Sequence, residues 1–180
     1  MSEGLPSKKE ALLLLRKSGC SKTVVEHCKS VARVALQMAD VFKARRIKVD
    51  LELVEAGALL HDIGRSKTHT VHHAIVGAQI AESLGLPKPI ISIIKRHVGG
   101  GITVKEARRL GWPEDIYMPK TLEEKIIAYA DKLVDGSRKV TIERAIGKFI
   151  SDQSLPRSSI TLLRKLHQEM SALLGDCKCP

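Results

Sequence analysis

The chain has 180 residues, of which 43% are apolar and only 3% are aromatic. This length fits one domain, whose core Leu, Ile, Val and Ala must fill. No apolar run approaches the roughly 20 residues of a membrane helix, and charges flank the leucine run near the N-terminus, unlike in a secretory signal. We therefore expect a soluble cytoplasmic protein without a membrane partner. In that compartment its cysteines stay reduced: Cys20, Cys28, Cys177 and Cys179.

The net charge of +10 predicts an affinity for anions such as phosphate esters, nucleotides, RNA or an acidic protein. The densest basic groups are residues 43–48 and 105–109, and no aromatic side chains that could stack on bases lie among them. A solvated surface explains the same charge, because the cations are spread along the chain. A nucleic-acid partner and a merely solvated surface therefore both stay open.

Helical periodicity and helix caps recur along the whole chain. Asp50 is a suitable N-cap, and Thr103 and Thr121 each begin a capping box. No segment alternates like a strand over six or more residues. The sequence therefore predicts an all-α protein with helices over residues 8–17, 22–44, 51–60, 72–84, 88–97, 104–110, 122–134, about 141–152 and 158–174.

The most informative feature is the His61-Asp62 doublet, which ends an apolar helix (LVEAGALLHDIG). A buried imidazole beside a buried carboxylate is costly unless another group pairs with both. A divalent metal is the usual partner, because imidazole and carboxylate together suit zinc, manganese and iron. The doublet therefore predicts a metal site, provided that further ligands converge on it.

Other residues of ligand type stand on separate predicted helices, at His27, His73, His97 and Asp131. Each has a simpler interpretation when taken alone. His27 lies on an apolar helix face and could be a core residue, and Asp131 could be a buried cap or a salt-bridge partner of Arg96 or Lys132. Their joint occurrence in this order is the stronger signal.

In this order, these segments resemble the HD superfamily of metal-dependent phosphohydrolases. The matching pieces lie within residues 20–136 and are Glu26-His27-Cys28, Ala58 to Gly64, His73 to Ala78, Ile94 to His97, and Ala130-Asp131-Lys132. The resemblance implies an HD-domain helical bundle and a phosphatase or phosphodiesterase activity. Such an enzyme cleaves a phosphate ester or phosphoanhydride of a nucleotide, or of another small phosphorylated substrate, with metal-activated water.

The metal ligands are also implied by the resemblance. Those assigned to one metal are His27, His61, Asp62 and Asp131. His73 and His97 match the extra histidines of HD proteins with two metals, in which Asp62 would bridge both ions. This set is most similar to the HD-domain dinucleoside tetraphosphate hydrolases. It departs from the cyclic-di-GMP phosphodiesterases, because the Gly-Tyr-Pro motif is absent and His97 stands where that group has two histidines. One or two ions of Fe, Mn, Zn, Ni, Co or Mg fit the set.

His72 and His73 lie about equally near the doublet in sequence, so nearness alone does not tell which of them is the metal ligand. Gly77 follows His73 by four residues, and its missing side chain would let the helix approach a neighbour closely. The family pattern also favours His73. We therefore predict that His73 is the ligand, and the alternative His72 stays open.

Basic residues near the predicted ligands are candidates for contact with substrate. Those expected to bind its phosphate are Arg65, Lys67, Arg96 and Lys132. The residues expected to take part in catalysis are Asp62, Arg65 and Lys132. Surface solvation is the alternative for each cation, and no motif identifies a dedicated general acid.

The expected organisation is one compact unit with three parts. An N-terminal helix over residues 1–19 packs on the core, the HD domain covers residues 20–136, and a C-terminal helical extension covers residues 137–180. The extension has no further cluster of ligand-type residues. We therefore interpret it as packing or interface material, which could include a homodimer contact.

Two other functions fit the same residues. A nucleic-acid or nucleotide binding module could retain the HD site without turnover, in keeping with the charge of +10. Its binding would weaken steeply with salt. An HD-fold oxygenase could hold a mixed-valence di-iron centre on a similar ligand set.

Overall fold

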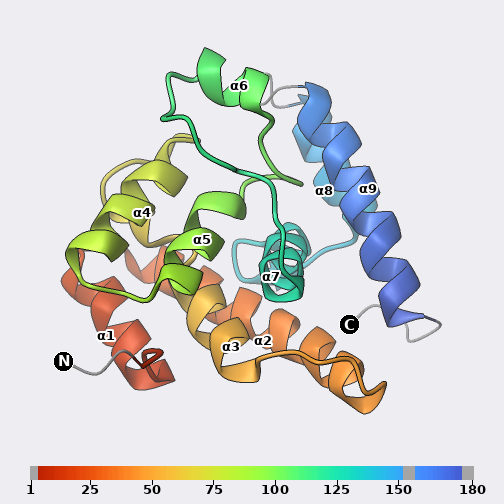
Figure 1. Cartoon of the computed structure of the whole chain (residues 1–180), viewed down its shortest axis with the longest axis horizontal. Helices are drawn as coiled ribbons and strands as arrows, with labels where there is room; N and C mark the ends of the chain where they lie inside the picture. The colour runs from red at the N-terminus through yellow and green to blue at the C-terminus, as the bar shows by residue number, and fades with distance from the viewer. Residues whose placement is uncertain (1–3, 152–156, 176–180) are drawn as a thin grey trace.

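The computed structural model describes residues 4–151 and 157–175, and these residues are mostly helical (Figure 1). The α-helices are α1 (Lys8–Lys17), α2 (Lys22–Ala44), α3 (Leu51–Leu60), α4 (His73–Ser83), α5 (Lys88–Arg96), α6 (Val104–Arg109), α7 (Leu122–Lys132), α8 (Ile142–Ser151) and α9 (Arg157–Leu174). A 3-10 helix, η1 (Ile63–Ser66), follows α3. The predicted all-α class is confirmed. Residue 152, the predicted end of one helix, lies outside the described residues, as do Cys177 and Cys179.

Side-chain caps begin the helices where the sequence predicted them. Thr103 and Thr121 each form a complete capping box, and the Asp50 side chain accepts a hydrogen bond from the backbone N–H of Leu53. Each cap satisfies a backbone donor that the first helical turn leaves without a partner. The helix starts are therefore encoded locally.

Helix α7 lies at the centre of the fold and contacts α2, α3, α5 and α9 (Figure 1). Its residues 126–130 are all buried, so this helix is covered on every side. Helix α2 supplies much of the remaining core through side chains such as Met38 and Phe42. The core is largely aliphatic, as the scarcity of aromatic residues predicts.

The segment after α3 makes a close backbone contact with α4. A Cβ atom built on Gly64 would lie 2.0 Å from the carbonyl oxygen of His73 and 2.6 Å from the backbone nitrogen of Gly77. A Cβ atom on Gly77 would lie 2.9 Å from a methyl carbon of Ile94. The predicted close approach at Gly77 is therefore present, and it brings the His61-Asp62 segment next to the start of α4.

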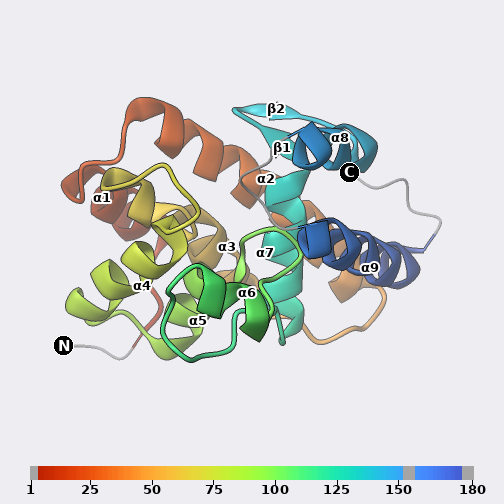
Figure 2. The ribbon, with the colours of Figure 1, turned by 90° about the horizontal axis from the view of Figure 1, so that it is seen from above.

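A short β-hairpin follows α7, where the sequence predicted that the helix continues to residue 134. Its antiparallel strands are β1 (Val134–Asp135) and β2 (Arg138–Lys139), and Gly136 at the turn has a φ of 61°. Strands of two residues are too short to show alternation, which is why the sequence analysis missed them. In Figure 2 the hairpin lies beside α8.

Cys20 and Cys28 are free thiols. Within the described part of the chain, no helix is both long enough and apolar enough to cross a membrane. The predicted boundaries between the N-terminal helix, the HD domain and the C-terminal extension, at residues 19 and 136, stay predictions. In the structure α1 packs against α3, and α9 packs against α7 and α8.

The close contact between Gly64 and the backbone of α4 leads to a prediction about stability. We expect Gly64→Ala to lower the free energy of unfolding by about 1–3 kcal/mol or more, because the new Cβ collides with backbone atoms that cannot move independently. Gly147→Ala is the matched control, since a Cβ there would lie within 4 Å of no described atom outside the neighbouring backbone of its own helix. This control should stabilise α8 by up to about 1 kcal/mol. Urea unfolding followed by circular dichroism measures both variants, and equal effects would contradict the prediction.

Candidate metal centre

The predicted ligands converge at helix ends. His61 and His97 are the C-cap residues of α3 and α5, and Asp131 lies in the last turn of α7. His73 is the first residue of α4, and His27 comes from α2. The carbonyl ends of α3, α5 and α7 therefore meet in one region, where the negative ends of their helix dipoles favour a cation.

Backbone carbonyls orient the four imidazole rings. The Nδ1 atoms of His61, His73 and His97 each donate to the carbonyl three residues earlier, at 2.7 Å. Nδ1 of His27 donates to the Gly136 carbonyl in the hairpin, at 2.8 Å. Because a carbonyl only accepts, Nδ1 carries the hydrogen in each ring, and the neutral ring has a lone pair at Nε2.

The Asp62 carboxylate lies between two pairs of these rings. Its Oδ2 atom is 3.7 Å from Nε2 of both His27 and His61. Its Oδ1 atom is 3.1 Å from Nε2 of His73 and 3.4 Å from Nε2 of His97. Each carboxylate oxygen therefore faces a different pair of nitrogens.

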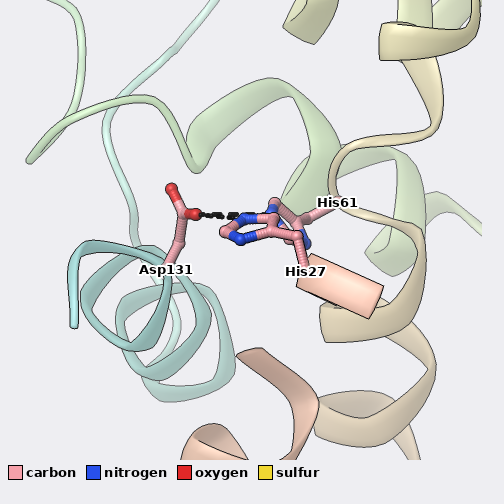
Figure 3. A group of neighbouring side chains, drawn as sticks. All are labelled: His27, His61 and Asp131. Atoms are coloured by element: carbon pink, nitrogen blue, oxygen red, sulfur yellow. Dashed lines mark hydrogen bonds and ion pairs between the residues drawn. The ribbon is translucent and has the colours of Figure 1, made fainter. Parts of the chain in front are cut away.

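Asp131 completes one of these groups from the side of α7. Its Oδ1 atom is 3.0 Å from Nε2 of His27 and 3.5 Å from Nε2 of His61, and Figure 3 shows the carboxylate directed at both rings. The three ligand atoms of this group lie within 4.8 Å of one another, as do those of His61, Asp62 and His97. Either group could hold a metal ion.

Several polar atoms of the cluster lack a suitable partner among residues 4–151 and 157–175. Nε2 of His73 and Nε2 of His97 face each other at 2.9 Å, although both rings direct their Nδ1 hydrogen elsewhere. Among the described residues, Nε2 of His61 and Oδ1 of Asp62 are buried without a hydrogen-bond partner. A cation satisfies lone pairs of this kind, so the donor set fits a divalent metal.

Both carboxylates are ionised at neutral pH. Burial raises the pKa of Asp62, but the charge of His61 and the close approach of the His73 ring outweigh it and hold the pKa well below its usual range. Burial likewise raises the pKa of Asp131, and the charge of Lys132 outweighs it.

The histidines differ in their readiness to bind a metal. Burial lowers the pKa of His97 to about 4, so this ring is neutral at pH 7. Burial also lowers the pKa of His27, but the hydrogen bond and charge of Asp131 outweigh it, and the net shift is upward. Because only a neutral imidazole binds a metal, protons would compete with a metal more strongly at His27 than at His97.

A cleft of about 380 Å³ opens beside the cluster, and His27, Asp62 and Asp131 lie in its wall. Two of the predicted phosphate-binding residues line it as well. Arg65 donates from Nε to Oδ2 of Asp62 at 2.5 Å, and Lys132 forms an ion pair with Asp131. Both cations therefore lie next to the carboxylates of the cluster.

The structure does not bring Arg96 or Lys67 to this cleft. Arg96 donates to the buried Glu124 carboxylate at 2.6 Å and to the Ile116 carbonyl at 3.1 Å, which makes it part of a structural ion pair. Neighbouring residues of a helix point about 100° apart, so Arg96 turns away from the site that His97 faces. Lys67 is exposed and is not among the described residues of the cleft wall.

The structure places His73, and not His72, in the cluster. His73 is buried with its Nε2 atom beside Asp62. Nδ1 of His72 instead accepts a hydrogen bond from Nε1 of Trp112, at 2.9 Å. Of the two histidines, His73 is therefore the one beside Asp62, and its role as a metal ligand stays a prediction.

The sequence analysis missed two contributions from residues after 135. The Gly136 carbonyl orients His27, and Arg144 and Lys148 of α8 line the cleft. The spacing of Arg144 and Lys148 predicts that they share one helix face. It does not indicate which segment that face contacts. The sequence therefore predicts only packing or interface material in this region.

The chain is similar to known proteins over most of its length. The HD domain family matches residues 24–134. An uncharacterized protein of Methanocaldococcus jannaschii is 44% identical over 92% of this chain and 98% of its own length. The tRNA (cytidine(56)-2'-O)-methyltransferase of Picrophilus torridus is 39% identical over 95% of this chain and 48% of that enzyme. Ribonuclease Y of Petrotoga mobilis is 30% identical over 75% of this chain and 23% of that enzyme.

This chain therefore spans about half the length of the methyltransferase and about a quarter of ribonuclease Y. Among solved structures, the HD domain of the L. monocytogenes phosphodiesterase PgpH in complex with cyclic-di-AMP has a similar fold. The TM-score is 0.55 at 21% identity, over 89% of this chain and 96% of that chain. The HD-domain helical bundle is thus confirmed, and the chain belongs to the HD-domain family.

Proposed function

We propose that this protein is a metal-dependent phosphohydrolase that cleaves a phosphodiester or phosphoanhydride of a nucleotide or short oligonucleotide. The observation that carries the proposal is the placement of the Asp62 carboxylate between two pairs of imidazole nitrogens, at the wall of a cleft with cationic side chains. Two of the similar proteins are named for cleavage of phosphodiesters, ribonuclease Y and the phosphodiesterase PgpH.

The residues proposed to hold one metal are His27, His61, Asp62 and Asp131. Those proposed to hold a second metal are His73 and His97, with the other oxygen of Asp62. A divalent ion bound there would lower the pKa of its water ligand and supply hydroxide near neutral pH. Iron, manganese, zinc, nickel, cobalt and magnesium are the candidates, because mixed imidazole and carboxylate ligands admit several of these ions.

Arg65 and Lys132 are proposed to bind the phosphate that is cleaved. Both line the cleft, and each is paired with a carboxylate of the cluster. A metal held by those carboxylates would neutralise them, and the two cations would then be available to phosphoryl oxygens. Positive groups that are already in place stabilise the charge that develops there during the reaction.

An alternative function is binding of nucleic acid without turnover. The net charge of +10 and the alignment with part of a tRNA methyltransferase favour it. Binding to RNA that weakens with salt, in metal-loaded protein that hydrolyses no phosphodiester, would support this alternative. A homodimer and a location in the cytoplasm stay predictions.

Metal content tests the proposed ligands. We expect about two metal ions per chain in protein purified without chelator, about one in His97→Ala and none in Asp62→Ala, because Asp62 would bind both ions. Hydrolysis of bis(p-nitrophenyl) phosphate with added manganese, iron, cobalt or nickel should fall by at least about 100-fold in Asp62→Ala. Two ions retained in His97→Ala, or full activity after chelation, would refute the assignment.

The pair His72→Ala and His73→Ala provides a matched control. Both variants remove one imidazole at neighbouring positions, but only His73 lies beside Asp62. His73→Ala should lose about one metal ion, and His72→Ala should keep the wild-type content. Elemental analysis measures both, and the opposite pattern would show that His72 is the ligand.

The raised pKa of His27 predicts the pH dependence of metal binding. Below that pKa a proton occupies the ring, so metal affinity at the site with His61 and Asp131 should fall about tenfold for each further unit of pH. Above it the affinity should level off. Calorimetric titration in buffers of different ionisation enthalpy should detect about one proton released near pH 6. Affinity independent of pH between 5 and 8 would count against His27 as a ligand.

A further inference from the structure

Helix α8 adds a second group of cations to the wall of the cleft. Arg144 and Lys148 are four residues apart and therefore lie on the same face of α8. Both line the 380 Å³ cleft that also contains His27 and Asp62. Helix α8 follows residue 134, where the HD family match ends, so this part of the wall lies outside the matched region.

The hairpin fixes these cations relative to the metal ligands. Asp135 of β1 is 2.6 Å from Nζ of Lys148 and 4.0 Å from Nη2 of Arg144. The next residue, Gly136, holds the His27 ring through its carbonyl. A short run of backbone therefore connects the α8 cations to a predicted ligand, and Figure 2 shows α8 and the hairpin side by side.

The charge balance distinguishes this group from the cations near the cluster. Among the described residues, Arg65 and Lys132 form ion pairs with Asp62 and Asp131 of the cluster, whereas Arg144 and Lys148 both pair with Asp135. In this part of the chain the α8 group therefore has two cations beside one carboxylate. Its side chains are 68% and 60% exposed, so an anion can reach them.

The same cleft also has an apolar part. The side chains that form it are Val24, Val134, Val140 and Ala145. A base or sugar can pack on such a surface, while phosphates need the cations. The wall thus has three parts. One phosphate can lie at the predicted metal ligands, a base or sugar can pack on the apolar side chains, and a second phosphate can lie at the cations of α8.

We infer that Arg144 and Lys148 form a subsite for a second phosphate, so that the cleft prefers substrates with a phosphate beyond the one that is cleaved. This inference rests on the proposed function and narrows its substrate class to nucleotides or oligonucleotides with at least two separate phosphates. The smallest probe is the dinucleotide pApA, which differs from ApA only by its 5′-phosphate.

The test compares binding of pApA and ApA to metal-loaded full-length protein by calorimetry. Wild type should bind pApA about five- to tenfold more tightly than ApA, since two exposed cations each contribute a few-fold. In Arg144→Gln/Lys148→Gln this preference should fall below about twofold. The conservative variant Arg144→Lys/Lys148→Arg should retain most of it. Equal binding of pApA and ApA by wild type would overturn the inference.

The matched control is Lys105→Gln/Arg109→Gln, which removes the same residue types at the same spacing from α6. Both side chains are exposed, and neither is among the described residues of the cleft wall. A similar loss of preference in this control would assign the effect to overall charge and overturn the subsite.

Hydrolysis of bis(p-nitrophenyl) phosphate reports separately on the proposed function. If wild type prefers pApA but hydrolyses no phosphodiester, the subsite stands and the proposed hydrolysis fails. If it hydrolyses the reporter but binds pApA and ApA equally, the hydrolysis stands and the subsite fails.

Discussion

The structure depends on the burial of an ionised carboxylate, Asp62, among imidazole rings. An unpaired charge in a protein interior costs several kcal/mol or more, so positive charge must accompany it. Here four rings direct Nε2 atoms toward Asp62, and backbone carbonyls hold their Nδ1 atoms. This arrangement leaves lone pairs facing one another, and a cation resolves that conflict. Other features of the fold serve to bring these groups together.

Close packing and helix direction bring them together. The contact between Gly64 and Gly77 allows η1 to lie against α4, which sets the distance between Asp62 and His73. The C-terminal ends of α3, α5 and α7 point at the same region and favour positive charge there. The cluster is thus built by rigid helices around a largely aliphatic core, and the proposed ligands would need little reorganisation to accept a metal.

Two parts of the chain form the cleft wall. The HD core supplies the cluster and the cations next to it, Arg65 and Lys132. The hairpin and α8, which follow the matched region, supply the orientation of His27 and a further cationic face. The segment after the matched region is also coupled to the core, because the Gly136 carbonyl contacts the ring of His27, a predicted ligand.

The sequence by itself determined the all-α class, most helix starts and the residues of the cluster. Caps such as Thr121 act on their own helix. The order of the histidines and aspartates along the chain is a sequence pattern that resembles the HD family. Only the tertiary structure decided that Arg96 turns toward Glu124, that His72 pairs with Trp112, and that α8 borders the cleft. These facts depend on where helix faces lie relative to distant segments. Periodicity shows which residues share a face, but packing between segments far apart in the chain determines what that face meets.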